Sequence, residues 1–110
     1  MFNQGVTAVE ITSLAGQTTG TGPAVPVNNR AKVGLLVEYS TGVSAGEVTL
    51  EAAATSDYSG LWSPQFTVGQ PASVPGCAGQ AAEIVGAFVR PRVTTTVSGG
   101  TIVKMVVYIY

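Results

Sequence analysis

The sequence predicts an all-β, antiparallel fold of the β-sandwich or jelly-roll kind, with roughly six to eight short strands. Two observations support this prediction. The chain is punctuated throughout by 14 glycines and 6 prolines, and threonine and valine are abundant between them, which is typical of short strands joined by turns. Several segments between the turns also alternate apolar and polar side chains, the two-residue period of a strand with one buried face.

Residues 31–39 form the clearest predicted strand, and residues 47–55 form a second one after a turn at residues 41–46. The first strand is expected to bury Ala31, Val33, Leu35, Val37 and Tyr39. The second places Val48, Leu50, Ala52 and Ala54 on one face and Glu47, Thr49 and Glu51 on the other. A helix competes over the second segment, since Ser44 and Glu47 fit a capping box, but the strict alternation favours a strand.

Residues 87–97 and 101–110 are the next two predicted strands. Ser98-Gly99-Gly100 between them is a tight-turn signal, so we expect these two strands to pair as a hairpin. Pro91 has no N–H to donate to a ladder, which predicts an edge position or a bulge at that residue.

The remaining segments carry weaker signals. Strands are predicted over residues 6–14, 24–28 and 65–68, and a long surface loop over residues 69–80, which are rich in proline, glycine and alanine. Residues 1–30 are either an N-terminal arm that reaches a neighbouring subunit or first strands followed by a flexible loop, and residues 31–110 form the β-sandwich domain.

Composition excludes several classes of partner. The chain of 110 residues has only five lysines and arginines and a net charge of −1, too little positive charge for a nucleic-acid partner. No apolar run approaches the length of about 20 residues that spans a bilayer, so we expect no membrane partner. Because only 10% of residues are charged and 45% are hydrophobic, we expect part of the surface to be covered in a homo-oligomer or a larger assembly.

The sequence offers little chemistry. It has no histidine and one cysteine, which removes histidine-based nucleophilic sites and structural zinc, so we expect no enzyme, no cofactor and no metal site. Gly42-Val43-Ser44-Ala45-Gly46 matches the nucleophile-elbow pattern of hydrolases, but a turn between two strands explains it better. Glu47 and Glu51 share a strand face as glycosidase carboxylates could, yet a solvated surface is the favoured interpretation.

The interface candidates are therefore aromatic, apolar and arginine side chains, namely Phe2, Val6, Tyr58, Trp62, Arg90, Arg92, Tyr108 and Tyr110. Tyr58 and Trp62 could form a sugar-stacking platform, although a Trp62 lid over one end of the sandwich is favoured. Arg90 and Arg92 could fork onto carboxylates of a neighbouring subunit or lie on a solvated edge. Tyr108 and Tyr110 share a strand face and are expected to cover core or a subunit boundary.

A resemblance rests on four segments of residues 31–110: Glu47-Val48-Thr49-Leu50-Glu51-Ala52, Asp57 with Trp62, Phe88-Val89-Arg90-Pro91-Arg92-Val93-Thr94, and Ser98-Gly99-Gly100-Thr101. In this arrangement a strand leads to a tryptophan-bearing loop, and an arginine-rich strand leads through a glycine turn to a last strand. It resembles the small β-sandwich virion proteins of tailed bacteriophages, of the capsid decoration or cement type.

The resemblance implies a structural protein of the virion, made in the host cytoplasm, that binds the major capsid protein on the outer surface of the shell as a dimer or trimer. Residues 1–14 would then be the candidate reaching arm. The same pattern also occurs in sandwich modules that bind carbohydrate, so a carbohydrate- or receptor-binding module of a phage tail or fibre is the alternative.

Overall fold

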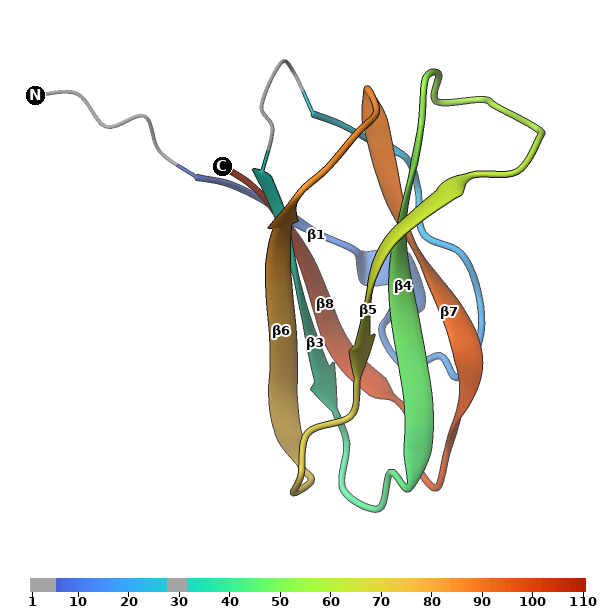
Figure 1. Ribbon diagram of the computed structural model, residues 1–110. Helices are drawn as coiled ribbons and strands as arrows, with labels where there is room; N and C mark the ends of the chain where they lie inside the picture. The colour runs from blue at the N-terminus through green and yellow to red at the C-terminus, as the bar shows by residue number, and fades with distance from the viewer. Residues whose placement is uncertain (1–5, 28–31) are drawn as a thin grey trace, which may run out of the picture.

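The computed structural model describes residues 6–27 and 32–110, which form an all-β structure (Figure 1). Its elements in chain order are β1 (Thr7–Glu10), the 3-10 helix η1 (Thr12–Leu14), β2 (Val25–Pro26), β3 (Lys32–Tyr39), β4 (Ala45–Ala53), β5 (Ser63–Gly69), β6 (Gly76–Glu83), β7 (Phe88–Ser98) and β8 (Ile102–Ile109). The predicted fold class is confirmed.

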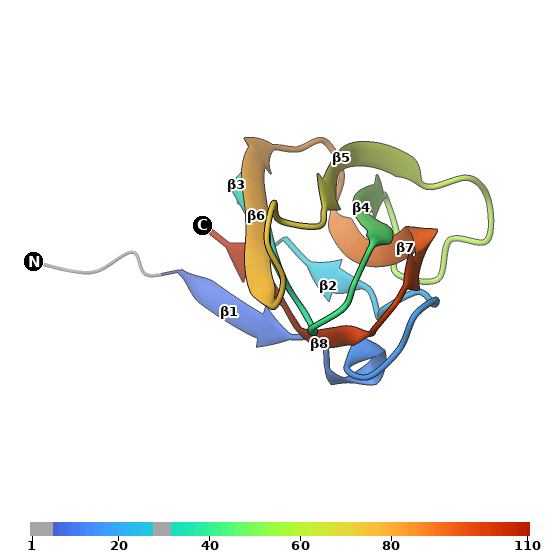
Figure 2. The ribbon, with the colours of Figure 1, turned by 90° about the horizontal axis from the view of Figure 1, so that it is seen from below.

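The strands form two antiparallel sheets that pack face to face. Sheet A has the order β1-β8-β3-β6 and sheet B the order β2-β7-β4-β5. Seen from below in Figure 2, the strands of the two sheets surround a common interior, which the core side chains fill. Both halves of the chain contribute to this core, since Ile11 and Leu14 lie in it beside Leu50 and Val107.

The predicted inner face of the first clear strand is confirmed in β3, where Val33, Leu35, Val37 and Tyr39 are at most 2% exposed. Ala31 lies outside the described residues. Val48 and Leu50 of β4 and Val89 of β7 meet these side chains from sheet B. Because each buried valine or leucine contributes about 1.5–3 kcal/mol relative to an exposed one, this double layer is the main source of stability.

Strand β4 confirms the strand over the competing helix, but its polar face was predicted incorrectly. Thr49 and Glu51 are only 5% and 4% exposed, so both faces of the strand are buried where solvent was expected. Neighbouring side chains from β7 and from the β4–β5 loop cover the outer face at this point. Ala54, predicted to lie on the inner face, falls beyond the strand and is exposed.

The predicted hairpin across Ser98-Gly99-Gly100 is wrong. Strand β7 pairs with β4 in sheet B, whereas β8 pairs with β3 and β1 in sheet A, so the turn carries the chain from one sheet to the other. The β3–β4 connection makes the same crossing at the same end of the sandwich (Figure 1). A glycine turn specifies a reversal of the chain, and core packing decides which strands then pair.

The two crossings lie against each other, and the contact depends on Gly42 and Gly99. Both residues have positive φ, +91° and +83°, and a Cβ on either one would collide with the carbonyl oxygen of the other. Close by, Ser44 N–H donates to the carbonyl oxygen of Ser98 at 2.8 Å. Only glycine combines this backbone conformation with this closeness of approach.

Strand β6 occupies the second half of the loop predicted over residues 69–80, so that prediction is wrong there. It pairs with β3 from Lys32↔Glu83 to Tyr39↔Gly76 without a register shift. Its sequence, GCAGQAAE, contains no β-branched or aromatic residue, and glycine and alanine are depleted in strands generally. Residues 76–83 therefore form a strand because they pair with β3, although their own strand propensity is low.

Pro91 lies neither at an edge nor at a bulge. It pairs regularly with Leu50, and the register shifts of this strand pair lie beside Glu47. The Pro91 carbonyl accepts the N–H of Gly22 at 2.8 Å, so the backbone polar groups of Pro91 point away from β4. The side of Pro91 that lacks an N–H therefore faces away from β4. On that side β7 pairs only with the short β2 and through one isolated bridge.

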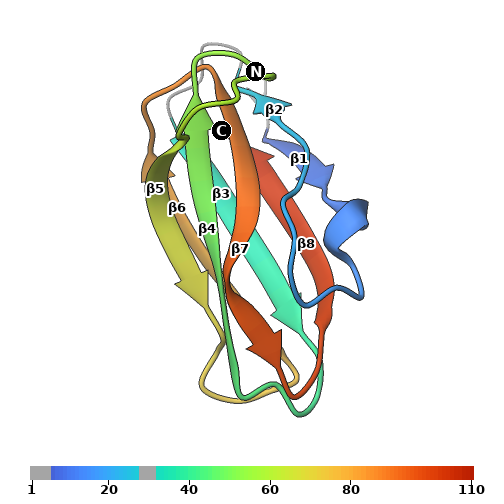
Figure 3. The ribbon, with the colours of Figure 1, turned by 90° about the vertical axis from the view of Figure 1, so that its right-hand side faces the viewer.

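The described part of the proposed N-terminal arm is built into the sandwich. Strand β1 pairs with β8 from Thr7↔Ile109 to Glu10↔Val106, and Ile11 and Leu14 are 1% and 3% exposed. Figure 3 shows β1 and η1 beside β8. Residues 1–5, including Phe2, lie outside the described residues, as do residues 28–31.

Within the described ranges no helix is long and apolar enough to cross a membrane.

Candidate functional site

The outer face of sheet B carries an ion-pair cluster formed by Glu51, Arg90 and Arg92. Strand β4 places Glu51 directly opposite Arg90, and the alternation of β7 brings Arg92 to the same face. Arg90 Nε lies 3.1 Å from Glu51 Oε1, and Arg92 Nε lies 2.7 Å from Glu51 Oε2. One nearly buried carboxylate, 5% exposed, therefore accepts from two guanidinium groups, which satisfies the charge that burial would otherwise penalise.

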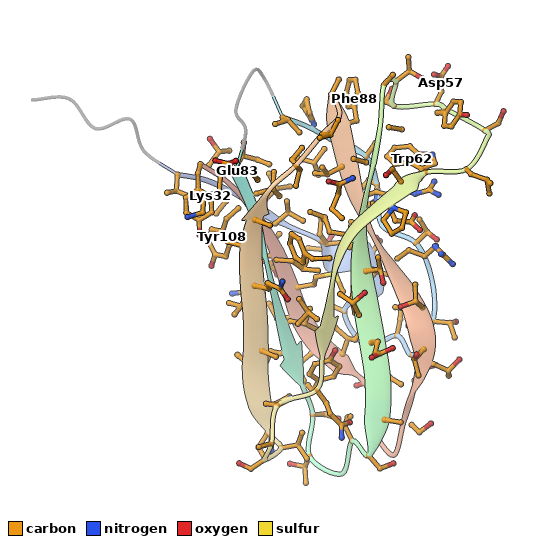
Figure 4. All side chains as sticks on the ribbon, viewed as in Figure 1. Lys32, Asp57, Trp62, Glu83, Phe88 and Tyr108 are labelled. Atoms are coloured by element: carbon orange, nitrogen blue, oxygen red, sulfur yellow. The ribbon has the colours of Figure 1, made fainter. Side chains whose placement is uncertain are left out.

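Trp62 covers this cluster. The Arg90 guanidinium carbon lies 4.1 Å from the centre of the indole ring, a cation–π contact, and the indole Nε1–H donates to the Tyr58 carbonyl at 2.9 Å. Trp62 is 6% exposed and lies outside the main core, so it closes the outer face of sheet B rather than one end of the sandwich. Figure 4 shows Trp62 in the loop that also carries Asp57.

The structure thus brings together four of the predicted candidates, Tyr58, Trp62, Arg90 and Arg92, around a carboxylate of their own chain. Neither alternative predicted for the two arginines, a carboxylate of a neighbouring subunit or a solvated edge, describes them, because both bind Glu51 of their own chain. Arg92 keeps 45% of its side chain exposed, and Tyr58 is 47% exposed. The arrangement fastens the β4–β5 loop to the sheet, which is a structural task.

Hydroxyl groups continue the polar network along the same face. Thr49 Oγ1 lies 2.9 Å from Thr67 Oγ1 and 3.0 Å from Thr94 Oγ1, linking the three longest strands of sheet B. Thr95 donates to Glu47 Oε1 at 2.9 Å, so Glu47 and Glu51 take part in separate contacts. In the part of the chain that the structure describes, no three potential metal ligands gather.

A second candidate surface lies on the outer face of sheet A, and we call it the tyrosine surface. Tyr108 pairs with Gly34 on one side and with Ala8 on the other, and the Tyr110 ring lies against Gly34. Here an open groove of about 300 Å³ is lined by Gly34, Leu35, Leu36, Gly79, Gln80, Ala81, Tyr108 and Tyr110. Figure 4 shows Tyr108 beside Lys32 and Glu83 at this face.

Within the described part of the chain, no charged residue lines the groove of the tyrosine surface, but the same sheet face carries Glu10, Glu38 and Lys104, which the register places in phase with Tyr108. Lys32 Nζ lies 5.2 Å from the centre of the Tyr110 ring, and Lys32 is paired in register with Glu83 across β3 and β6. Tyr110 is 41% exposed, and Val6, another predicted candidate, is 51% exposed just before β1. The groove therefore offers two aromatic rings among uncharged residues, within a face that also carries charges; aromatic rings and an uncharged centre are typical of an interface core.

The groove was missed in the sequence because its floor consists of glycine and alanine. The only signal that could have indicated it is Gly34, a residue without a side chain between the apolar Val33 and Leu35 of the predicted strand. Gly79 gave no signal, since it lies in the loop predicted over residues 69–80, and Ala81 follows that loop in a segment for which no strand was predicted.

Tyr39 is the one described residue with a clearly shifted pKa. Burial, and next to it the negative charge of Glu47, raises the pKa of Tyr39 to about 12. Its hydroxyl donates to the Val68 carbonyl at 3.4 Å between the sheets. The neutral phenol is therefore the form that the fold stabilises.

Removing this hydroxyl, in Tyr39→Phe, is expected to reduce the loss of stability that accompanies a rise of pH in the alkaline range. The pKa of Tyr39 in the folded protein is raised above the unfolded value of 10. The contribution of the neutral phenol to the free energy of unfolding is therefore fully present below about pH 10 and is lost as the pH rises toward about 12. Between about pH 8 and pH 11 the loss is about 1.4 kcal/mol in the wild type. Urea unfolding at both pH values should show a smaller decrease for Tyr39→Phe, and equal decreases would contradict the assignment.

In comparisons with protein-family models, with curated proteins and with solved structures, no match to this chain was found.

Proposed function

We propose that this chain is a structural protein of a virion, a capsid decoration protein that binds the major capsid protein on the outer surface of the shell and stabilises it. The observation that carries the proposal is the tyrosine surface, an apolar groove of about 300 Å³ beside Tyr108 and Tyr110 on an exposed sheet face. Tyrosine is enriched among the residues that dominate binding energy, and small neighbours allow a partner to approach closely.

The rest of the molecule suits this role. A cement protein needs a rigid frame and a complementary surface, and it needs no reaction centre. The two packed sheets supply the frame, while the bonds of Glu51 to two arginines fasten the loop that covers sheet B. The resemblance to tailed-phage decoration proteins over residues 31–110 supplies the identity of the partner.

Tyr110→Ala is the variant that tests the proposal. Tyr110 is 41% exposed, so its removal should leave the core intact while weakening binding to undecorated shells by about tenfold or more. Tyr58→Ala is the matched control, because Tyr58 is similarly exposed, at 47%, but lies on the sheet B side. Co-sedimentation with purified shells would measure both affinities, and equal affinities for the two variants would overturn the assignment of this surface.

The alternative function is a carbohydrate-binding module of a phage tail or fibre, and the same groove favours it, since tyrosine rings also stack against sugars. Trp62, which the sequence offered with Tyr58 as the less favoured sugar-stacking platform, is only 6% exposed and has Arg90 against its ring. A glycan array therefore distinguishes the two functions. Specific glycan signals that disappear in Tyr110→Ala would replace decoration by sugar binding, and silence would favour decoration.

A further inference from the structure

Among the described residues, strand β6 is a long sheet edge with nothing paired to one of its sides. It spans eight residues, and within residues 6–27 and 32–110 its only ladder is the uninterrupted one to β3. Figure 1 shows β6 at the margin of the sandwich. Its outer backbone groups therefore form a regular row of donors and acceptors that another strand could pair with.

The other three sheet edges carry features that block such pairing. Strand β1 is four residues long and leads directly into Ile11 and η1. Strand β2 has two residues, one of them Pro26, and β5 contains Pro64 beside a register shift. These are the short lengths, prolines and bulges by which proteins protect their edges.

Strand β6 has none of these features. It contains no proline, lysine or arginine, and its single charged residue, Glu83, stands at its end. Its other side chains are Gly, Cys, Ala and Gln, and the middle residues Gly79, Gln80 and Ala81 are exposed. An edge that is regular, uncharged and lined by small side chains is suited to close approach by a second strand.

We propose that β6 pairs antiparallel with β6 of a second copy of this chain, joining the two A sheets into one continuous sheet across a twofold axis. In such a pair, opposite residues must project from the same face of the sheet. Cys77, Gly79 and Ala81 share the outer face, because they pair with Glu38, Leu36 and Gly34 of β3. The register that places Gly79 opposite its own copy sets Cys77 opposite the second copy's Ala81.

Self-complementarity is the reason to assign a second copy as the occupant. In this register only Gly, Cys, Ala and Gln side chains face each other, and both Glu83 residues fall outside the overlap at opposite ends. Each Glu83 also keeps its own Lys32 as cross-strand neighbour. No like charges meet, and the tyrosine surfaces of the two copies lie on the same face of the joined sheet.

The size of the contact predicts its strength. One strand edge buries less than the roughly 1,200 Å² of a small specific interface, so the dimer should be weak and dependent on concentration in solution. The effective concentration on a shell surface would strengthen it. The inference concerns the purified protein alone, so its failure would leave the proposed shell binding untouched.

Ala81→Cys tests the register directly. Opposite residues of an antiparallel pair have Cα atoms about 4.5–5.5 Å apart, within the span of a disulfide. The new cysteine and Cys77 of the same chain are about 13 Å apart along the strand and cannot close on each other. Mild oxidation should therefore give a disulfide-linked dimer. Thr96→Cys, an exposed position on β7, is the control with the same number of cysteines. Absence of the dimer, or an equal yield in the control, would overturn the register.

Gln80→Lys tests the pairing itself. It adds a charge to the exposed middle of the edge, next to the twofold axis, and should raise the dimer dissociation constant about tenfold or more. Thr96→Lys adds the same charge away from the edge and should leave the constant unchanged. Sedimentation equilibrium over a range of concentrations would measure all three proteins. A wild type that stays monomeric up to about 1 mM, or the same constant for both variants, would refute the dimer.

Discussion

Gly99→Ala is expected to lower the free energy of unfolding by about 3 kcal/mol. Gly99 has a φ of +83°, where an L side chain is strained, and its Cβ would collide with the carbonyl oxygen of Gly42 in the neighbouring crossing. Both objects in this collision are backbone, so relief requires the two sheet-to-sheet connections to move apart. Such a movement also disturbs the hydrogen bond from Ser44 to Ser98.

Gly16→Ala separates the strain of the positive φ from the collision of the added Cβ. Gly16 has nearly the same φ, +79°, but nothing lies within 4 Å of a Cβ built there. Its substitution should cost only about 1 kcal/mol, the strain of the backbone conformation alone. Urea unfolding of the two variants gives the comparison. Equal losses would mean that the two crossings do not pack against each other as described.

Glu51→Gln is expected to cost about 2–3 kcal/mol. The amide keeps the size of the side chain but leaves Arg90 and Arg92 side by side without their shared negative charge. The full penalty of breaking a buried pair is reduced here, because Arg92 is 45% exposed and solvent screens its charge. Since Glu51 itself is nearly buried, most of the effect should persist at about 0.5 M salt.

Glu47→Gln is the matched control for this charge. Glu47 lies on the same strand face but is exposed, and it accepts from Thr95 rather than from an arginine. Its substitution should change stability by less than about 0.5 kcal/mol. If thermal and urea unfolding gave similar losses for the two variants, the Glu51 cluster would not fasten the outer face of sheet B.

The sequence predicted well those strands whose two faces differ in polarity. Strand β3 has the charged Lys32 and Glu38 on its outer face, with Leu36 as an apolar exception, and its inner face is buried as expected. Strand β6 was missed because its glycine and alanine residues carry neither alternation nor β propensity, and only the β3 ladder shows it to be a strand. The sheet assignment of β7 and β8 was missed because a glycine turn specifies a reversal without specifying the partner strand.

The sequence indicated which side chains belong to the candidate sites, but it did not indicate which residues from other strands lie beside them. Tyr108 and Tyr110 were placed on one strand face, but the groove beside them needs Gly34 of β3 and Gly79 of β6. For Arg90 and Arg92 the sequence left two possibilities, carboxylates of a neighbouring subunit and a solvated edge, and it did not indicate a partner within the chain. Glu51 was assigned to a solvated face because its burial depends on β7 and on Trp62, which the chain brings together only in the folded state.

The number of copies of this chain in purified particles from its source, measured by quantitative mass spectrometry, tests the proposed function most directly. A decoration protein covers the shell, so the account predicts on the order of hundreds of copies per particle, consistent with repeated binding over a symmetric surface. A few tens of copies or fewer would contradict decoration and point to the tail or fibre, and complete absence would contradict a virion role altogether.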